Sequence, residues 1–176
     1  MKETSFSQAA PGFLGRLILV LAVFGLSLPG HLFAAEEIYF GTVERVVDGD
    51  TIAFLTQDFE RVRVRLYGID APEKNQSGGP ESSQALKALI EGKSAEVRVL
   101  DVDRYNRLVG LIYLNGQSVN LALVADGHAW VYKRHCRSKE ICREMTQAES
   151  IAKDEGRGLW AEPNPVPPWD HRRRAR

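Results

Sequence analysis

Carboxylates and arginines stand close together at three places in the 176-residue sequence. These are residues 48–51 (DGDT), residues 65–73 (RLYGIDAPE) and residues 103–107 (DRYNR). Carboxylate oxygens suit hard cations, and the planar fork of an arginine matches the oxygens of a phosphate. Each segment alone also has an ordinary explanation: a hairpin turn, an acidic start to a helix, or a solvated arginine at a strand end. Taken together and in this order, the three segments are a much less ordinary combination than each is alone.

The overall charge excludes a globally basic nucleic-acid binder. The chain has 23 Lys+Arg and 23 Asp+Glu, so its formal net charge is zero. No long-range positive field would therefore attract a polyanion, and affinity for phosphates must come from a local cluster. Hydrophobic residues make up 44% and charged residues 26% of the sequence, which is typical of a globular domain and excludes a disordered, collagenous or multi-span membrane chain.

Residues 1–34 have the pattern of a secretory signal peptide. Basic Lys2 and Arg16 precede an apolar run at residues 17–28, and small residues follow near Ala34. The apolar run is shorter than the roughly 20 residues that a membrane-spanning helix needs. The pattern predicts a secreted or periplasmic protein, and the alternative is an uncleaved membrane anchor.

The rest of the chain predicts one α+β domain, residues 35–162, followed by a tail at residues 163–176 that is first Pro-rich and then Arg-rich. Runs of β-branched and alternating residues predict five strands, at residues 38–47, 51–56, 61–66, 95–100 and 109–114. Helices are expected between Gly79 and Gly92 and at residues 118–125 and 139–155, and the proline-rich segment after Trp160 is expected to be extended. The order of elements predicts a five-stranded Greek-key β-barrel of the OB type with three added helices.

Cys136 and Cys142 are the two cysteines of the chain, and an exported context favours a disulfide between them. Six residues apart in one continuous helix, their Cα atoms would be about 9 Å apart, which is too far to bridge. A disulfide therefore requires Cys136 to precede the last predicted helix and Cys142 to lie in its first turn. The rival interpretation is a zinc site that includes His135, although three candidate ligands are one short of a closed structural site.

With these segments in view, the chain resembles the staphylococcal-nuclease-like (thermonuclease) family of calcium-dependent phosphodiesterases. The resemblance runs from Gly41 to Trp160 and includes further segments at residues 119–124 (VNLALV), 130–133 (WVYK) and 149–153 (ESIAK). The ending, Pro-Val-Pro-Pro-Trp followed by arginines, is similar to that of endonuclease-like members from bacterial cell envelopes.

The resemblance implies a calcium site made by Asp50, Asp70 and the backbone carbonyl of Ala71. Family members often have Thr in place of Ala71, but the ligand is a backbone carbonyl, so calcium binding should survive the change. Two carboxylates and a carbonyl also leave room on Ca²⁺ for waters and substrate. The expected cofactor is therefore Ca²⁺.

The resemblance also implies that Arg65 and Arg107 grip the scissile phosphate and that Glu73 acts on the attacking water. Fixed donors of this kind are each worth on the order of 10²–10³ in rate. Attack in line with the leaving 5′-oxygen would leave a 3′-phosphate. The sequence leaves open whether Glu73 is a general base or mainly orders the site.

Three aromatic residues are candidates for substrate contact: Tyr105, Trp130 and Tyr132. Trp130 stands where the archetype has a tyrosine, so it can stack on a base or sugar but offers no phenolic hydroxyl. For Tyr105 and Tyr132 a place in the core is the alternative. The arginines of the tail either contact phosphates or belong to a solvated chain end.

The sequence therefore predicts an exported, Ca²⁺-dependent endonuclease that hydrolyses DNA and RNA with little sequence specificity, and no stable protein partner is implied. The first alternative is an OB-fold module that binds nucleic acid without cutting it, and the second is a structural envelope protein that uses only the fold. Both alternatives are disfavoured because the implied metal and phosphate residues are all present together.

Overall fold

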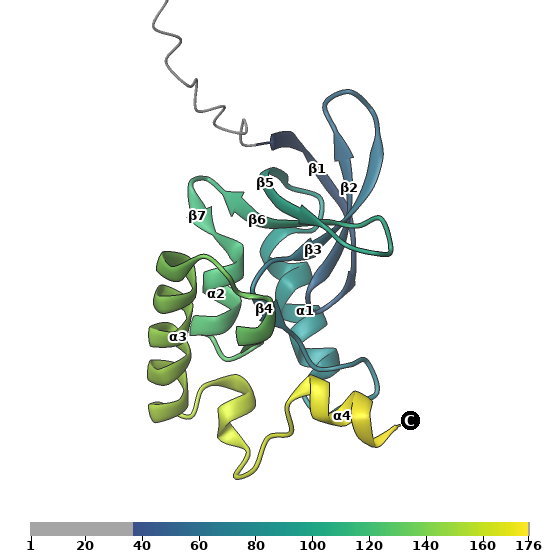
Figure 1. The fold of residues 1–176 in the computed structure, drawn as a ribbon. Helices are drawn as coiled ribbons and strands as arrows, with labels where there is room; N and C mark the ends of the chain where they lie inside the picture. The colour runs from purple at the N-terminus through teal and green to yellow at the C-terminus, as the bar shows by residue number, and fades with distance from the viewer. Residues whose placement is uncertain (1–36, 176) are drawn as a thin grey trace, which may run out of the picture. The chain divides into compact units, whose positions relative to one another are not determined.

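An antiparallel meander of three strands begins the structure, a computed structural model that describes residues 37–175 (Figure 1). The strands are β1 (Glu37–Asp48), β2 (Thr51–Thr56) and β3 (Arg61–Leu66). β3 alternates as predicted, with Val64 and Leu66 buried on one face. The predicted signal segment, residues 1–34, lies outside the described residues.

Two further long strands close the meander into a barrel. β5 (Ser94–Val102) pairs with β1, and β6 (Leu108–Leu114) pairs antiparallel with β5. β6 also pairs in parallel with β3, where Arg65 lies opposite Val109, so the strand order returns to its start. The result is a closed, mixed five-stranded barrel, which confirms the predicted OB-type α+β fold.

β1 can serve two neighbours because a glycine allows a close approach on one side. Gly41 pairs with Thr56 of β2 and with Ala95 of β5. A Cβ atom at Gly41 would lie 2.1 Å from the carbonyl oxygen of Leu55, so no other residue fits without moving the backbone. The β1–β2 pairing also shifts register twice, and these irregularities add to the curvature that a small barrel needs.

Helices lie beside and below the barrel in the view of Figure 1. They are α1 (Gly79–Ile90), α2 (Val119–Ala125), α3 (Lys139–Asp154) and α4 (Pro168–Arg174), with 3₁₀ turns η1 (Lys133–His135) and η2 (Gly158–Ala161). The first three helices confirm the prediction. None of the helices among residues 37–175 is both long and apolar enough to cross a membrane.

The fourth helix corrects the prediction that the chain is extended after Trp160. η2 includes Trp160, and α4 begins at Pro168 within the proline-rich segment. Proline is tolerated in the first helical turn because the backbone N–H it lacks would have no partner there. Asp170 then places an acid in the first turn, and the following arginines lie in the last turn, which suits the helix dipole at both ends.

The core fills the barrel and continues between the barrel and the helices. The barrel strands contribute Val43, Ile52, Phe54, Val64, Val97 and Ile112, and the helices contribute Leu86, Leu123 and Met145, all of them at most 1% exposed. Buried Asn120 accepts a hydrogen bond from the Ile112 N–H and donates to the Tyr67 and Gly110 carbonyls, so its polar atoms are paired. The barrel is thereby joined to α2.

A disulfide links Cys136 to Cys142, with the two Cα atoms 5.7 Å apart. Cys136 follows η1, and Cys142 lies in the first turn of α3, as the geometric argument required. Since neither sulfur is a free thiolate, the zinc interpretation with His135 is wrong.

Two very short strands, β4 (Ile69–Asp70) and β8 (Trp130–Val131), pair antiparallel outside the barrel, and β7 (Gln117–Ser118) extends β6. Asp70 lies directly opposite Trp130 in this pairing. Glu149 of α3 accepts a hydrogen bond from the Val131 N–H at 2.8 Å and fixes β8 in place. The β4–β8 pair therefore brings one acidic segment next to one aromatic segment.

Candidate active site

The turn between β1 and β2 presents Asp50 at the edge of the barrel. Its carboxylate accepts hydrogen bonds from the Thr51 hydroxyl (3.0 Å) and from the Ala71 N–H (3.0 Å). A Cβ atom on Gly49 would lie 2.6 Å from the Cβ of Ala71, so the turn packs directly against the segment that follows β4. Residues 48–51 and 65–73, separate in the sequence, are thus in contact.

Arg65 joins the two acidic segments. It ion-pairs with the carboxylate of Asp50, and its guanidinium lies 2.9 Å from Asp70 Oδ1 and 3.2 Å from the Ile69 carbonyl. Its side chain is only 17% exposed, unlike those of Arg61 and Arg63 on the same face of β3. The third arginine of the alternating strand is therefore the one that enters the site.

The two buried aspartates differ in their electrostatic balance. Burial favours the neutral acid at Asp50, but the charge of Arg65 and the hydrogen bond from the Ala71 N–H outweigh it and lower the pKa. At Asp70, burial outweighs the hydrogen bonds that it receives and raises the pKa. Burial and the charge of Asp50 also raise the pKa of Asp48. The site is therefore short of positive charge.

A second guanidinium reaches this site from α4. Arg172 Nη2 lies 2.6 Å from Asp70 Oδ2, and Arg172 Nη1 lies 2.6 Å from Glu73 Oε1. These bonds raise the pKa of Arg172 above its usual value even though partial burial would lower it. The sequence analysis offered the tail arginines as phosphate contacts or as a solvated chain end, and it missed this contact with the acidic residues. The acid at Asp170 after a proline, followed by a run of arginines, is the helix signal that could have found it.

The residues of the site fit a divalent cation. Arg65 links the carboxylates of Asp50 and Asp70, and Arg172 links those of Asp70 and Glu73. Asp50, Asp70 and the adjoining Ala71 carbonyl form an oxygen donor set that suits a hard ion such as Ca²⁺. No group of three or more His, Cys, Asp or Glu side chains within residues 37–175 is arranged to hold a metal. Water and substrate oxygens would have to complete the coordination.

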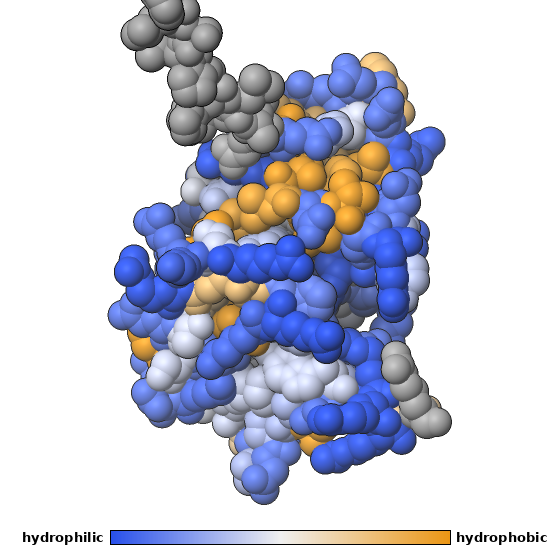
Figure 2. Space-filling view, viewed as in Figure 1, coloured by the Kyte–Doolittle hydropathy of each residue, from blue (hydrophilic) through white to orange (hydrophobic). Residues whose placement is uncertain are grey.

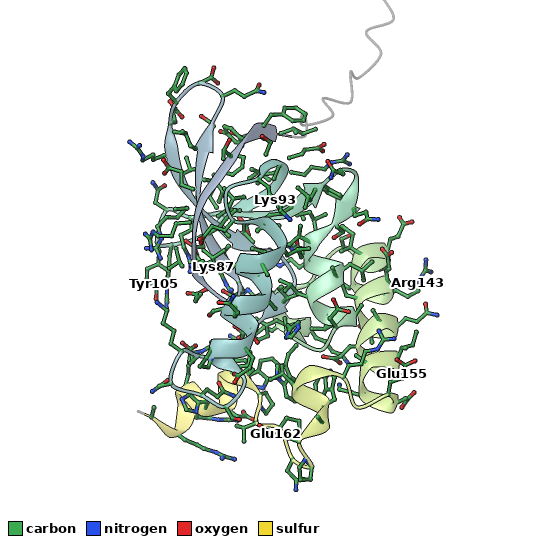
Figure 3. The ribbon with its side chains drawn as sticks, turned by 180° about the vertical axis from the view of Figure 1, so that it is seen from behind. Lys87, Lys93, Tyr105, Arg143, Glu155 and Glu162 are labelled. Carbon is green, nitrogen blue, oxygen red and sulfur yellow. A yellow bond between two sulfur atoms is a disulfide. The ribbon has the colours of Figure 1, made fainter. Side chains whose placement is uncertain are left out.

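The third sequence segment is not brought into contact with this cluster. Arg107 donates to Asp103 Oδ2 at 2.7 Å, and Tyr105 lies 5.5 Å from the Arg107 guanidinium carbon. Burial would raise the pKa of Asp103, but hydrogen bonds from Arg107 and Tyr105 lower it. Figures 1 and 3 both show the β5–β6 turn on the same side of the molecule as α4, and Figure 3 shows Tyr105 at that edge, away from α3. Tyr105 is 64% exposed, so its alternative placement in the core is wrong.

A groove of about 700 Å³ adjoins the acidic cluster through Arg172, which lines the groove and contacts Asp70. Its aromatic side chains are Trp130, Tyr132 and Trp169, and its charged side chains are Lys133, Arg134, Glu149, Lys153, Arg172 and Arg173. Figure 2 shows strongly hydrophilic side chains around α4, with a paler surface between them. Aromatic faces among cations are suited to the bases and phosphates of a single strand. Trp130 and Tyr132 line the groove as candidate contacts, whereas Trp169 was missed because the tail was expected to be extended.

Segments distant in the sequence thus meet around a closed barrel: an acidic cluster, an arginine held between two carboxylates, and an aromatic, basic groove. This arrangement is that of a barrel protein that acts on a phosphodiester. The family model described as "Staphylococcal nuclease homologue" matches residues 63–162, and the chain belongs to this family.

Curated relatives agree with this assignment. An "Uncharacterized endonuclease" of Escherichia coli O157:H7 is 42% identical over 135 residues, which cover 76% of this chain and 85% of the relative. "Protein ParB" of Escherichia coli is 40% identical over 142 residues, with coverages of 76% and 78%. "Micrococcal nuclease" of Shigella flexneri is 37% identical over 142 residues, with coverages of 76% and 80%. Family membership and these similarities support nuclease activity, which is a hydrolase activity.

Proposed function

We propose that the protein is an exported, calcium-dependent endonuclease that hydrolyses DNA and RNA with little sequence specificity. The observation that carries the proposal is the position of Arg65, held between buried Asp50 and Asp70 at the edge of the barrel. A guanidinium fixed by two carboxylates does not have to reorganise before it meets a phosphate, which is the condition for transition-state stabilisation. A groove of aromatic and cationic side chains agrees with low sequence specificity, because every base has a face that can stack on an aromatic ring.

Each residue has a separate task in the proposed reaction. Arg65 and Arg107 donate to the phosphate oxygens, where negative charge accumulates as the water attacks. Calcium, when bound by Asp50, Asp70 and the Ala71 carbonyl, would offset the phosphate charge and polarise the P–O bond. Glu73, half-buried and three residues after Asp70, accepts the water proton at a carboxylate oxygen. The water oxygen bonds to phosphorus, the P–O5′ bond breaks, the 5′-oxygen takes a proton from solvent, and the product keeps a 3′-phosphate.

Arg107 must leave Asp103 for this task. The Arg107–Asp103 pair is formed within one turn, and both side chains are 20% exposed, so exchanging the carboxylate for a phosphate does not disturb the core. Arg65 needs no such change. The proposed reaction therefore uses one preset arginine and one that is recruited by the substrate.

Export and a secreted or periplasmic location are part of the proposal and rest on residues 1–34. The disulfide supports it, since disulfides persist in oxidising compartments. Fractionation of cells that express the full chain, with and without residues 1–34, checks this part.

Plasmid cleavage in Ca²⁺ and in chelator tests the activity. We expect cleavage in Ca²⁺ alone, and Asp50→Ala or Asp70→Ala should raise the Ca²⁺ concentration required and lower the rate. Asp58→Ala, in the exposed turn between β2 and β3, is the matched control. Binding of the plasmid without cleavage under any condition would instead identify a non-catalytic nucleic-acid-binding module.

A further inference from the structure

The C-terminal helix lies on the oxygens that the proposed function assigns to the cation and to water activation. Arg172 contacts Asp70 Oδ2 and Glu73 Oε1, each at 2.6 Å, and also lies 3.3 Å from Asp70 Oδ1. A guanidinium at hydrogen-bond distance and a metal ion cannot share the same carboxylate lone pairs. Arg172 and a divalent cation therefore compete for Asp70.

The same helix also covers the candidate base-stacking surface. Trp169 stacks on Tyr132 with ring centroids 5.1 Å apart and planes only 5° from parallel. It also meets Trp130 edge-on at 5.8 Å. A nucleic-acid base would stack on Tyr132 with this same parallel geometry, so Trp169 takes the place of a base on one face of the ring.

The segment before α4 is anchored to the loop that follows Glu73. The Gln76 side-chain amide donates to the Val166 carbonyl at 2.5 Å, and the Ser77 hydroxyl donates to Glu162. Trp160 packs against Trp130 with centroids 4.3 Å apart. These contacts do not involve the acidic cluster, so they would keep the tail near the site after Arg172 has left Asp70.

The geometry points to α4 as an internal occupant of the nuclease site, with Arg172 in the place of the divalent cation and Trp169 in the place of a base, both displaced when calcium and a nucleic-acid strand bind. This inference rests on the proposed function. It goes further because the C-terminal helix would inhibit that function, a role that we call the brake. Only molecules in which α4 has left the site would bind calcium at Asp70, so the apparent affinity for calcium is lowered in proportion to the fraction of such molecules. By linkage, calcium loosens α4 to the same extent that α4 weakens calcium binding.

The alternative role for Arg172 is to bind the substrate phosphate, together with Arg65 and Arg107. In the structure Arg172 contacts the carboxylates that the proposed function assigns to the cation and to the water, and it is carried by the C-terminal helix and not by the barrel. A phosphate-binding Arg172 would hold α4 more firmly at the site when a nucleic-acid strand binds, whereas a displaced Arg172 would release α4. Calcium affinity therefore tests the competition at Asp70, and hydrogen exchange of α4 in the presence of an oligonucleotide separates the two roles.

Calcium titration by calorimetry on the mature protein is the first test, with Arg172→Gln compared with wild type. We expect Arg172→Gln to bind Ca²⁺ more tightly by about 5-fold or more. Arg174→Gln, an exposed residue of the same helix, removes the same charge without touching the cluster and should leave the affinity near that of wild type. Equal or weaker binding by Arg172→Gln, or an equal gain in both variants, would overturn the inference.

Hydrogen exchange of the wild-type protein is the second test and needs no variant. Addition of Ca²⁺ and a single-stranded oligonucleotide should speed amide exchange in residues 168–174 and leave α2 unchanged. Slower exchange in α4 on adding the oligonucleotide would overturn the brake and assign α4 to the substrate surface.

The outcomes also separate this inference from the proposed function. Calcium-dependent cleavage with identical calcium affinity in wild type and Arg172→Gln would refute the brake alone. Absence of calcium binding in wild type, Arg172→Gln and Arg174→Gln alike would refute the calcium site and the brake together.

Discussion

Arg65 and Arg107 are alike in sequence, each an arginine near acids, but the structure treats them differently. Arg65 is paired with Asp50 and Asp70, which lie in two separate segments of the chain. Arg107 is paired with Asp103, four residues earlier in the same turn. The first arginine is held by tertiary structure and the second by local structure. A residue held by distant partners has its position fixed by the fold, whereas one held by a neighbour is free to exchange that neighbour for a ligand.

The largest expected effect comes from replacing each arginine by lysine, which keeps the charge but loses the planar fork. Arg65→Lys and Arg107→Lys should each lower turnover on a single-stranded oligonucleotide by roughly 10²-fold or more. Arg65→Lys should also lower the melting temperature, because two buried carboxylates lose hydrogen bonds, and Arg107→Lys should leave both melting temperature and calcium affinity nearly unchanged. Arg63→Lys, exposed on the same strand, is the control. Near-normal cleavage by Arg107→Lys would remove the β5–β6 turn from the site.

Glu73 extends the comparison to a carboxylate of the site. Its arginine partner is Arg172, which lies in α4 and not in the barrel. Glu73→Ala should lower turnover by about 10²-fold or more while calcium binding is retained, because the side chain is assigned to the water and not to the metal. Calcium titration beside turnover checks both parts, with Glu81→Ala in the exposed first turn of α1 as the control. Normal turnover in Glu73→Ala would show that another group activates the water.

The disulfide lies near the segment that follows Arg65 and β3, and not near the turn that holds Arg107. Cys136 approaches Gly68 next to β4, and the Tyr67 hydroxyl accepts hydrogen bonds from the Arg137 and Ser138 N–H groups. Replacing both cysteines by serine should lower the free energy of unfolding by about 2 kcal/mol, because the closed loop is short. Urea unfolding measures this. Two reactive thiols in the unfolded, unreduced protein would contradict the disulfide itself.

The smallest expected effect is the pH dependence of stability that comes from Asp103, the partner of Arg107. The pKa of Asp103 is lowered in the folded protein, so its ionised form stabilises the fold above its unfolded pKa of about 3.9. This stabilisation is lost as the pH falls through the lower folded value. Asp103→Asn should therefore be slightly less stable than wild type at pH 7, by urea unfolding, and the difference should shrink as the pH falls through the lowered folded pKa of Asp103. A difference that stays constant with pH would assign the effect to the backbone turn.

Local signals account for what was predicted correctly. The Asp-Gly turn, the alternation in residues 61–66 and the apolar stripe of α3 all depend on neighbours a few residues away. The position of Cys136 before α3 followed from the length of a helical turn. The prediction of the tail failed for the same reason: its prolines were taken to exclude regular structure, although proline is excluded from the interior of a helix and not from its first turn.

The sequence by itself determined the order of the five barrel strands and the first three helices, the positions that a disulfide would require of the two cysteines, and the residue types of the site, because these depend on backbone preferences and short spacings. Only the tertiary structure decided which charges meet. The parallel closure of β3 on β6 and the β4–β8 pair place Arg65 between two buried aspartates and leave Arg107 on its own turn. The tertiary structure also brings Arg172, which is 102 residues after Asp70 in the chain, into contact with the Asp70 carboxylate. The physical reason is that a buried charge is stable only when it is paired, and its partner can come from any segment that packs against it. Which distant segments pack together is not encoded in any short stretch of sequence.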